Sequence, residues 1–452
     1  MRVHFIAIGG AVMHNLAIAL HKKGYQVTGS DDEIFEPSRS RLNDYGLLPD
    51  KEGWDPSGIT RDIDTIILGM HAKGDNPELE KSKKLGLNVK SFPEFLYEQT
   101  RNKKRIVIGG SHGKTTITAI IMHVLKECGL NFDYMVGSVI DGFDTMVGLS
   151  DSSEIAVFEG DEYLTSTLDR RPKFHIYKPD VAVISGIAWD HINVFPEYNI
   201  YVDQFRIFVN QITTNGTLIF NEGDSIVKEI AIKARGDIKI VAYTMHAHFQ
   251  NKNGFYGATH NRIIPLKIFG EHNMQNMSAA KEVCLMAGVS EDDFYSAMQT
   301  FRGSAKRLQL LRERGSSAMY LDFAHAPSKV TATVNAVVDR YPGHRIIVCF
   351  ELHTYSSLNR DFLPQYRNTL SKADRAFVYY NPHALKLKRL DNLDAHEVKR
   401  SFGNQNVEVF DDSEKLIVRL FEEKGDKRIY LLMSSGDFNG TDIKKLAEQI
   451  IP

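Results

Sequence analysis

The sequence has few cysteines, no long apolar run and no excess of charge of either sign. Its three cysteines, Cys128, Cys284 and Cys349, are far apart and odd in number, which fits neither a disulfide framework nor a paired-cysteine metal or redox motif. We therefore expect a reducing compartment, the cytoplasm. The short apolar stretch at residues 3–8 runs directly into a double glycine, so no secretory signal is predicted. No stretch reaches the roughly 18 to 20 apolar residues of a membrane span.

Prolines are also scarce, and the charges balance. With 14 prolines and 42% apolar residues, the chain shows no low-complexity tract and can bury large cores. The formal net charge of -2 provides no overall field that would attract a polyanion such as nucleic acid. Any phosphate binding must therefore come from particular residues.

What the sequence does contain is a regular alternation of strand and helix patterns, which predicts an α/β fold with mostly parallel sheets. Its 452 residues exceed what one core usually organises, and we expect three domains, at residues 1–100, 101–303 and 304–452. A charged run at residues 101–105 is interpreted as a linker. The expected strands are 3–8, 25–28, 64–68, 105–108, 155–158, 181–185, 319–323, 345–350 and 429–433, with helices at 16–23, 78–85 and 93–99 and at the C-terminus.

The strongest motif stands between an expected strand and an expected helix. It consists of Gly110, Ser111, His112, Gly113, Lys114, Thr115 and Thr116. Glycines let backbone N–H groups converge on phosphate oxygens, the lysine meets the outer phosphates, and the Thr115 hydroxyl can bind Mg²⁺. The strict P-loop spacing would place a further glycine at Ile108, so the general pattern is only partly matched. A glycine-rich turn with a surface lysine is the alternative.

Acidic residues and a histidine follow the next two expected strands of this part. Glu159-Gly160-Asp161-Glu162 comes after residues 155–158, and Trp189-Asp190-His191 after residues 181–185. Carboxylates at the C-terminal ends of strands lie where α/β sheets place their ligands, and Mg²⁺ prefers hard oxygen ligands. Taken alone, such a cluster is more often a solvated loop.

A second glycine turn, Gly9-Gly10, follows the first strand, and Asp31 ends the second. This arrangement suggests a dinucleotide site, but the GxGxxG spacing is not met because its other positions are Ala7, Val12 or Asn15. We treat an NAD-dependent oxidoreductase as a remote alternative.

Together these motifs resemble the Mur ligase family, and the resemblance covers almost the whole chain. The matching segments, in family order, are residues 110–116, 159–162, Asp190-His191, Gly270-Glu271-His272-Asn273-Met274-Gln275-Asn276 with Ala279, and Lys306-Arg307 followed by Asp322-Phe323-Ala324-His325. The resemblance implies an N-terminal Rossmann-like domain that binds a UDP-sugar, a central P-loop ATPase domain, and a C-terminal Rossmann-like domain that closes over ATP and brings the acceptor.

The resemblance also implies a reaction. The lactyl carboxylate of UDP-N-acetylmuramate attacks the γ-phosphate of ATP, and the amino group of a peptide or amino acid then displaces phosphate to form an amide. Four residues are implied in catalysis: Lys114, His191, Arg307 and His325. Thr115, Glu159 and His191 would hold Mg²⁺. His272, Asn273, Asn276, Arg307 and Asp322 would join the residues of the phosphate loop on the nucleotide, and Gly9, Gly10, Ser30, Asp31 and His71 would bind the UDP-sugar.

Two helix boundaries have plain structural interpretations beside these roles. Asn273 could be the N-cap of a helix from residue 274, and the segment at residues 71–78 could be a helix start at a proline.

Several passages bear on the acceptor. Gly29-Ser30-Asp31 with Pro37-Ser38, residues 170–175 and residues 433–440 resemble the family members that attach the L-Ala-γ-D-Glu-meso-diaminopimelate tripeptide, as in cell-wall recycling. Glu351-Leu352-His353-Thr354-Tyr355 is more similar to the members that add L-alanine. We favour the tripeptide and keep L-alanine as the alternative.

The chain departs from the family pattern at four positions. Gly186 stands for a usual asparagine, Ala188 for a glutamate, Asn193 for an aspartate and Ala326 for a histidine. No lysine occurs between Lys178 and Lys228, which excludes a carbamoylated lysine from that segment. These changes keep open a second hypothesis, a catalytically weakened homologue that binds nucleotide.

Overall fold

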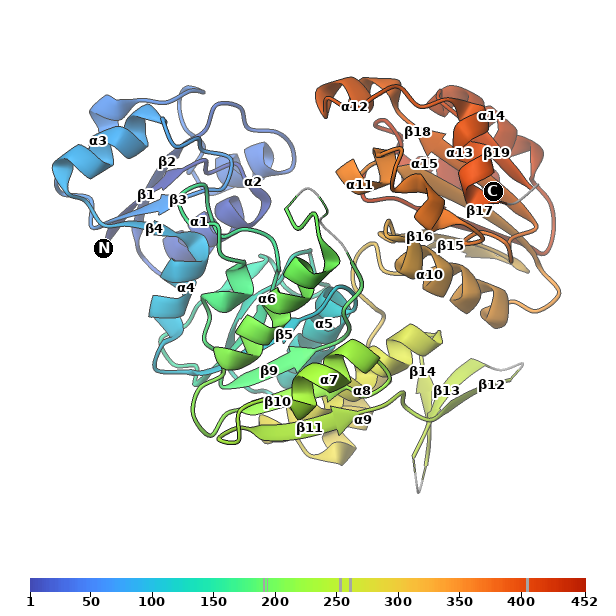
Figure 1. The fold of residues 1–452 in the computed structure, drawn as a ribbon, viewed down its shortest axis with the longest axis horizontal. Coiled ribbons are helices and arrows are strands. Elements are labelled where there is room, and N and C mark those ends of the chain that lie inside the picture. The colour runs from blue at the N-terminus through green and yellow to red at the C-terminus, as the bar shows by residue number, and fades with distance from the viewer. Residues whose placement is uncertain (190–191, 193, 252–253, 260–261, 404–405) are drawn as a thin grey trace. The chain divides into compact units, whose positions relative to one another are not determined.

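The computed structural model describes residues 1–452 except 190, 191, 193, 252, 253, 260, 261, 404 and 405. The described chain forms two compact units. Unit 1 comprises Met1–Ile187, Glu197–Thr244 and Asn276–Met298, and unit 2 comprises Ala188–Pro196, Met245–Gln275 and Gln299–Pro452. Strands and helices alternate throughout (Figure 1), and the expected mostly parallel α/β fold is confirmed. The three domain boundaries remain predictions.

The first sheet belongs to unit 1 and is wholly parallel, in the order β2-β1-β3-β4. Its strands are β1 (Arg2–Ile6), β2 (Gln26–Ser30), β3 (Thr65–Leu68) and β4 (Val89–Ser91). Its helices are α1 (Ala11–Lys22), α2 (Ser38–Asp44), α3 (Pro77–Leu85) and α4 (Phe92–Thr100). Asn76 caps α3 and Pro77 is its first residue, which confirms the predicted proline start. Because the strands are parallel, the turns after β1, β2 and β3 share one edge.

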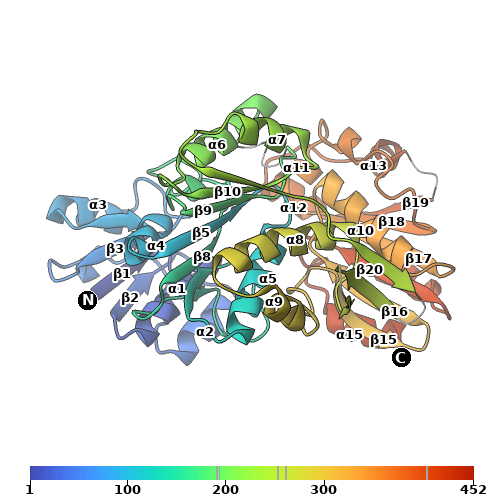
Figure 2. The ribbon, with the colours of Figure 1, turned by 90° about the horizontal axis from the view of Figure 1, so that it is seen from below.

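The central sheet, also in unit 1, has the order β11-β10-β9-β5-β8-β6-β7, and only the β6–β7 pair is antiparallel. Helices α6 and α7 cover one face, and α5 with α9 packed beside it covers the other (Figure 2). The strands are β5 (Lys104–Gly109), β6 (Phe132–Met135), β7 (Val147–Gly148), β8 (Ile155–Glu159), β9 (Val181–Ile184), β10 (Thr217–Asn221) and β11 (Lys239–Tyr243). The helices are α5 (Lys114–Glu127), α6 (Tyr198–Asn210), α7 (Ser225–Ile232), α8 (Glu271–Met286, which belongs to unit 1 from Asn276 onward) and α9 (Glu291–Met298). The adjacent strands β9, β5 and β8 therefore end at one edge, where the glycine-rich loop and the acidic motif begin.

Unit 2 is built on a six-stranded sheet, β15-β16-β20-β17-β18-β19, in which only β15–β16 is antiparallel. The strands are β15 (Gln309–Arg314), β16 (Ser317–Asp322), β17 (Arg345–Leu352), β18 (Arg375–Tyr380), β19 (Val407–Phe410) and β20 (Arg428–Met433). The helices are α10 (Pro327–Arg340), α11 (Tyr355–Leu358), α12 (Pro382–Leu387), α13 (Ala395–Phe402), α14 (Ser413–Glu422) and α15 (Ile443–Ile450). A small antiparallel sheet of β12 (His248–Asn251), β13 (Gly254–Ala258) and β14 (Ile263–Leu266) was not among the predicted elements.

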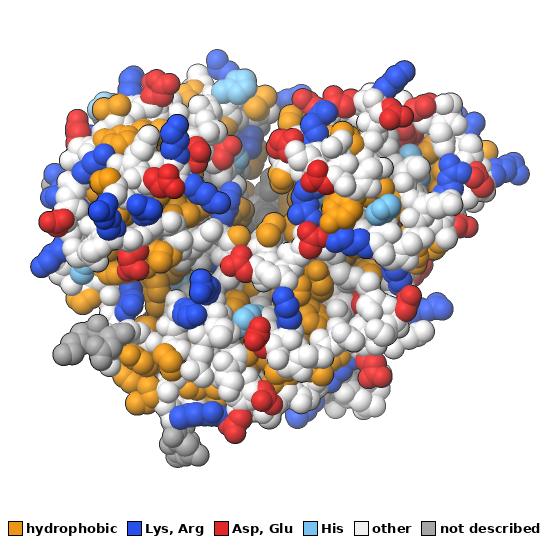
Figure 3. Space-filling view, turned by 180° about the vertical axis from the view of Figure 1, so that it is seen from behind, with side chains coloured by type: hydrophobic (Ala, Val, Ile, Leu, Met, Phe, Trp, Pro, Cys, Tyr) orange, Lys and Arg blue, Asp and Glu red, His pale blue; other side chains and the backbone are white. Residues whose placement is uncertain are grey.

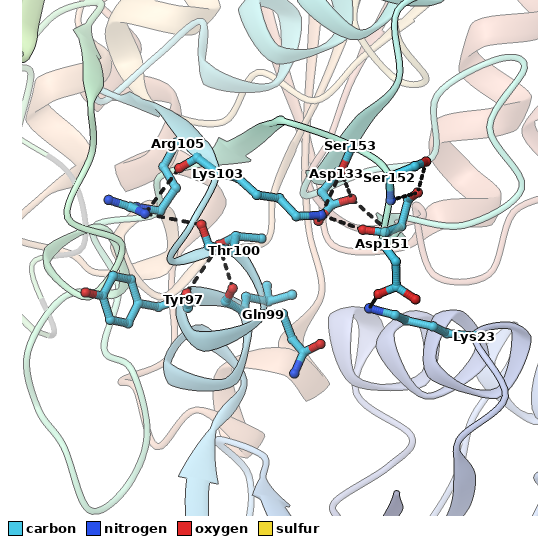
Figure 4. A network of polar contacts seen from close by, with 12 residues as sticks. Lys23, Tyr97, Gln99, Thr100, Lys103, Arg105, Asp133, Asp151, Ser152 and Ser153 are labelled. Carbon is cyan, nitrogen blue, oxygen red and sulfur yellow. Dashed lines mark hydrogen bonds and ion pairs between the residues drawn. The ribbon is translucent and has the colours of Figure 1, made fainter.

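The charged run at residues 101–105 is solvated only in part: Arg101, Asn102 and Lys104 are exposed as expected of a linker, whereas Lys103 is partly buried and Arg105 is buried (Figure 4). Lys104 and Arg105 open β5, and Arg105 is only 5% exposed. Its guanidinium donates to the carbonyls of Arg101 and Tyr177 at 2.8 and 3.0 Å. Backbone carbonyls and the Asp180 carboxylate, 3.3 Å from the guanidinium, thus stabilise a charge that the sequence pattern predicts to be in solvent.

Lys103 is partly buried in the same segment. Its Nζ lies 2.6 Å from Asp133 Oδ2 and 2.7 Å from Ser153 Oγ, and Asp133 is 1% exposed. Nearby, Lys23, the residue that follows α1, pairs with Asp151 at 2.7 Å. These contacts fix the start of the central sheet to its neighbouring loop.

Replacing Lys103 with methionine is expected to lower the free energy of unfolding by about 3 kcal/mol, because it leaves the buried Asp133 carboxylate without its cation. Urea unfolding followed by circular dichroism measures this. The matched control is Lys84→Met, since Lys84 and Glu80 form an exposed pair 3.9 Å apart that is worth less than about 0.5 kcal/mol. Equal midpoints for the two variants would contradict the assignment.

The surface carries both signs of charge. Figure 3 shows lysine and arginine interspersed with aspartate and glutamate on the face drawn, in keeping with the net charge of -2. Within the described part of the chain, no helix is both long and apolar enough to cross a membrane.

Candidate functional site

The loop between β5 and α5 needs glycine for steric reasons. Gly110 and Gly113 have φ of +129° and +80°, a region that side chains disfavour. A Cβ at Gly113 would lie 2.3 Å from Asn276 Oδ1, and one at Gly110 would lie 2.1 Å from Ser185 Oγ. The loop is therefore packed tightly between β9 and α8. It delivers the chain to the N-terminus of α5, whose dipole favours an anion.

The remaining loop residues hold this conformation. The Ser111 N–H donates to the Gly186 carbonyl at 2.9 Å, and the His112 carbonyl accepts a hydrogen bond from the Ser185 hydroxyl. Thr116 is buried in the first turn of α5. These contacts shape a cradle of the kind that binds phosphate.

Lys114, the first residue of α5, is held in an ion pair inside this cradle. Its Nζ donates to Glu162 Oε2 at 2.6 Å and to the Gly110 carbonyl at 2.7 Å. Burial alone would lower the pKa of Lys114, but attraction to Glu162 and then to Asp161 raises it above its ordinary value. The lysine is thus a cation at neutral pH, as phosphate binding requires.

Thr115 and Glu159 lie together at the ends of α5 and β8. The Thr115 hydroxyl donates to Glu159 Oε1 at 3.0 Å, and the Gly137 N–H donates to Oε2 at 2.8 Å. A hydroxyl beside a carboxylate offers the hard oxygen donors that suit Mg²⁺, so two of the predicted ligands fit that ion. The third, His191, lies outside the described residues. Among the residues that are described, no group of three or more His, Cys, Asp or Glu side chains forms a metal site.

Gly186, which departs from the family pattern, makes room for His112. A Cβ on Gly186 would lie 2.7 Å from His112 Cε1 and 3.3 Å from Asp224 Oδ2. The asparagine that is usual here would collide with that ring. The Asp224 carboxylate instead accepts from the Ile187 N–H at 2.8 Å, so the backbone after β9 is fixed without the asparagine side chain.

The turn after β1 is coupled to the end of β2. The Gly9 N–H donates to Asp31 Oδ2 at 2.7 Å, and a Cβ on Gly9 would approach the same oxygen to 2.9 Å. Gly10 is the N-cap of α1. Burial raises the pKa of Asp31 to about 6, against the opposing effect of the Gly9 hydrogen bond. Four of the five predicted UDP-sugar residues therefore gather at the edge where β1 and β2 end.

Ser30 is the fourth of these residues, and His71 is the fifth residue predicted to bind the UDP-sugar. The Ser30 hydroxyl donates to the buried Glu78 carboxylate, and Glu78 also accepts from the Asp55 N–H at 2.7 Å. His71 is exposed in the turn after β3. The Ser30 hydroxyl is thus held by the Glu78 carboxylate, whereas the His71 side chain is exposed to solvent.

The predicted nucleotide residues of α8 divide between its first two turns. The helix begins at Glu271, so the prediction of Asn273 as its N-cap was wrong: Asn273 lies inside the first turn and donates to the Phe269 carbonyl at 2.8 Å. Burial lowers the pKa of His272. Asn276 approaches Gly113 of the phosphate loop, as described above, and belongs to unit 1.

Arg307, Asp322 and His325 come together within unit 2. Asp322 accepts from the N–H groups of Leu308 and Ala324, both at 2.7 Å. The Arg307 guanidinium lies 4.7 Å from the centre of the Phe323 ring, and the His325 Nδ1 lies 3.1 Å from the Phe323 carbonyl. Asp322 is therefore the residue that ties the arginine loop to the end of β16.

Sequence reasoning assigned no role to Glu162 or Tyr201. Glu162 was part of the acidic run, but its partner could not be named without the fold. Tyr201 gave no signal, because an aromatic residue in an amphipathic helix usually belongs to the core.

A glycine cradle at a helix N-terminus, a cationic lysine and carboxylates at the ends of adjacent parallel strands define a P-loop nucleotide-binding protein. Three family descriptions match successive parts of the chain: "Mur ligase family, catalytic domain" at residues 2–104, "Mur ligase middle domain" at 108–284 and "Mur ligase, glutamate ligase domain" at 306–436. The chain belongs to the Mur ligase family, which confirms the resemblance seen in its motifs. It is an ATP-dependent, amide-forming ligase.

Relatives of two kinds are similar over nearly the full length. The UDP-N-acetylmuramate–L-alanine ligase of Caldicellulosiruptor saccharolyticus is 30% identical over 453 residues, 96% of each chain. The UDP-N-acetylmuramate–L-alanyl-γ-D-glutamyl-meso-2,6-diaminoheptandioate ligase of Haemophilus influenzae is 26% identical over 456 residues, 98% of each chain. The solved UDP-N-acetylmuramate-alanine ligase of Thermotoga maritima shares the fold with a TM-score of 0.74 at 18% identity, over 100% of this chain and 98% of that one.

Proposed function

We propose that this ligase joins the lactyl carboxylate of UDP-N-acetylmuramate to the amino group of L-alanyl-γ-D-glutamyl-meso-diaminopimelate. The observation that carries the ATP side is the cradle of Gly110 and Gly113 with Lys114 at its mouth. The UDP-sugar would lie at the edge formed by Gly9, Gly10 and Asp31. Relatives that act on UDP-N-acetylmuramate, by their names, support this sugar.

The proposed reaction has two steps. A lactyl carboxylate oxygen bonds to the γ-phosphorus of ATP, ADP leaves, and an acyl phosphate remains. The acceptor amine then attacks the acyl carbon, phosphate leaves with one carboxylate oxygen, and the amine loses a proton to solvent. Lys114 and Arg307 would offset the charge on the transferring phosphoryl group.

Magnesium belongs to this proposal. The Thr115 hydroxyl and the Glu159 carboxylate would hold it, with His191 as the predicted third ligand. When bound, Mg²⁺ neutralises charge on the phosphate oxygens. The protein's own contribution is to keep both oxygen donors at the mouth of the cradle, which the Gly137 N–H does by fixing Glu159.

The tripeptide is preferred over L-alanine because three passages of the sequence resemble the tripeptide-adding members. One of them, residues 433–440, is anchored by a buried carboxylate: Glu351 accepts from the Ser434 hydroxyl and from the Phe438 N–H, the latter at 2.9 Å. His353 lies over Gly436, where a Cβ would come within 2.5 Å of its Nδ1. The second candidate is L-alanine, favoured by the sequence of residues 351–355.

Steady-state turnover with each acceptor tests the choice. With ATP and UDP-N-acetylmuramate held saturating, the tripeptide is expected to give a kcat/KM at least about 10²-fold above that of L-alanine, since a site built for a larger acceptor loses most of its contacts with the smaller one. A preference for free L-alanine would reassign the acceptor and leave the ATP chemistry unchanged.

Binding of the UDP-sugar is expected to strengthen as pH rises through 6. A carboxyl with a pKa of about 6 is mostly neutral at pH 5 and mostly ionised at pH 7, and the ionised form accepts more hydrogen bonds from substrate hydroxyls. The KM for UDP-N-acetylmuramate should fall about tenfold across that interval. Asp31→Asn should give a flat profile with a high KM throughout. An unchanged pH slope in this variant would show that another group titrates.

A further inference from the structure

A fully buried tyrosine connects the phosphate loop to the partner of its lysine. Tyr201 lies on α6 and is 0% exposed. Its hydroxyl donates to Glu162 Oε1 at 3.0 Å and hydrogen-bonds Ser111 Oγ at 2.9 Å. The other Glu162 oxygen, Oε2, accepts from Lys114. One hydroxyl thus bridges a residue of the loop and the carboxylate that holds the lysine.

The ring that carries this hydroxyl is fixed by other aromatic rings. Tyr201 packs edge-on against Phe205, with ring centres 5.3 Å apart, and Phe205 packs against Phe174 in the same way at 5.4 Å. The position of the hydroxyl is therefore set by a rigid cluster rather than by the loop. A phenylalanine would fill the same space, so apolar packing alone does not explain the tyrosine.

The two oxygens of Glu162 have different partners because of this arrangement. Oε1 accepts from Tyr201, and Oε2 is the carboxylate oxygen that accepts from Lys114, at 2.6 Å. A carboxylate that is buried needs its hydrogen bonds. If Oε1 lost the hydroxyl, the carboxylate would turn toward the ammonium group and compete more strongly with phosphate for it.

We propose that Tyr201 is a positioning residue of the ATP site, which fixes Glu162 and Ser111 so that Lys114 can exchange its carboxylate for the phosphates of ATP. The inference rests on the role proposed above for Lys114. Tyr201 itself does not touch the reacting atoms and acts through Glu162.

The chain offers a matched control for the loss of one hydroxyl. Tyr177 is also 0% exposed in unit 1, and its hydroxyl has no hydrogen-bond partner among the described residues. Tyr177→Phe therefore removes the same atom from a comparable environment without touching the phosphate loop.

Calorimetric titration of the full chain with ATP and Mg²⁺ tests the inference, alongside steady-state kinetics. Tyr201→Phe is expected to raise the Kd and KM for ATP about tenfold, the effect of losing one hydrogen bond to a charged group, with the KM for UDP-N-acetylmuramate unchanged. Tyr177→Phe should change neither. ATP affinity in Tyr201→Phe equal to that of the wild type would overturn the inference, and so would an equal rise in both KM values.

A double-mutant cycle shows whether Tyr201 acts through Glu162. Glu162→Gln keeps the size of the side chain, and adding Tyr201→Phe to it should change ATP affinity by less than about twofold, because the two residues share one interaction. Effects of the two substitutions on the Kd for ATP that multiply independently would overturn the proposal.

The variant Lys114→Ala separates a failure of this inference from a failure of the proposed function. If Lys114→Ala binds ATP as tightly as the wild type, the proposed function fails. If Lys114→Ala binds ATP weakly while Tyr201→Phe binds it as the wild type does, only this inference fails.

Discussion

Replacing Lys114 with alanine is expected to abolish ligase turnover, with a loss of about 10³-fold in kcat/KM for ATP. The substitution removes the cation at the mouth of the cradle, so the charge of the transferring phosphoryl group loses its nearest compensation. It also leaves the buried Glu162 carboxylate without its ion-pair partner. Phosphate release, measured with UDP-N-acetylmuramate and the tripeptide both present, reports the effect.

The control for this variant lies on the same helix. Lys126→Ala removes a lysine from the last turn of α5, where its Nζ bonds the Gly142 carbonyl at 2.8 Å, and turnover should stay within about twofold. Folding of the Lys114 variant is checked by circular dichroism. Turnover by Lys114→Ala at more than a tenth of the wild-type rate would contradict the phosphate site.

Replacing Glu159 with glutamine is expected to lower kcat about 10²-fold and to raise the concentration of Mg²⁺ needed for half-maximal rate. The amide can keep both partners, because its oxygen can accept from the Gly137 N–H while its NH₂ donates to the Thr115 hydroxyl oxygen. The loop should therefore keep its shape while the charge that attracts the metal is lost. A titration of the rate against Mg²⁺ at fixed ATP measures both quantities.

Glu154→Gln is the matched control, because Glu154 is an exposed carboxylate just before β8, at the opposite end of the strand from Glu159. It should leave the Mg²⁺ dependence unchanged. A Glu159→Gln variant with the wild-type Mg²⁺ dependence would show that the metal is held elsewhere.

The alternation of strand and helix patterns was enough to predict the fold class from the sequence, because parallel strands buried on both faces give short, continuous apolar segments that stand out between helices. The strands predicted at residues 155–158 and 345–350 correspond to β8 and β17, which differ from them by no more than two residues at either end. The three-stranded antiparallel sheet was missed, since β12 carries exposed polar residues and alternates too weakly to stand out from a loop.

The charged run at residues 101–105 was predicted to be solvated throughout, and this prediction did not hold for Arg105. Five polar residues in a row usually mark a solvated linker, yet Arg105 is buried because the carbonyl groups of Tyr177 and Lys178, both distant in the sequence, accept hydrogen bonds from its guanidinium. Those acceptors come from the ends of other elements, and only the fold brings them together. The cap of α8 was misplaced for a similar reason, since Asn273 bonds backwards to Phe269 from within the helix.

The candidate site was predictable in its loop residues but not in their partners. Glycines, a lysine and a threonine at fixed spacing between strand and helix give a local signal, whereas the pairing of Lys114 with Glu162 depends on strand order. Tyr201 lies 90 residues from Ser111, and no spacing rule connects them. The role of a residue such as Tyr201, which acts through a second side chain, can therefore be inferred only from the structure.

The central claim is that a carboxylate is activated by transfer of the γ-phosphoryl group of ATP before the amide forms. The most direct test starts from UDP-N-acetylmuramate with both lactyl carboxylate oxygens labelled as ¹⁸O, incubated with enzyme, ATP, Mg²⁺ and the tripeptide. Mass spectrometry should find one ¹⁸O in each inorganic phosphate released, in equal amount to ADP and to the amide product. Unlabelled phosphate, or label in AMP, would contradict this account.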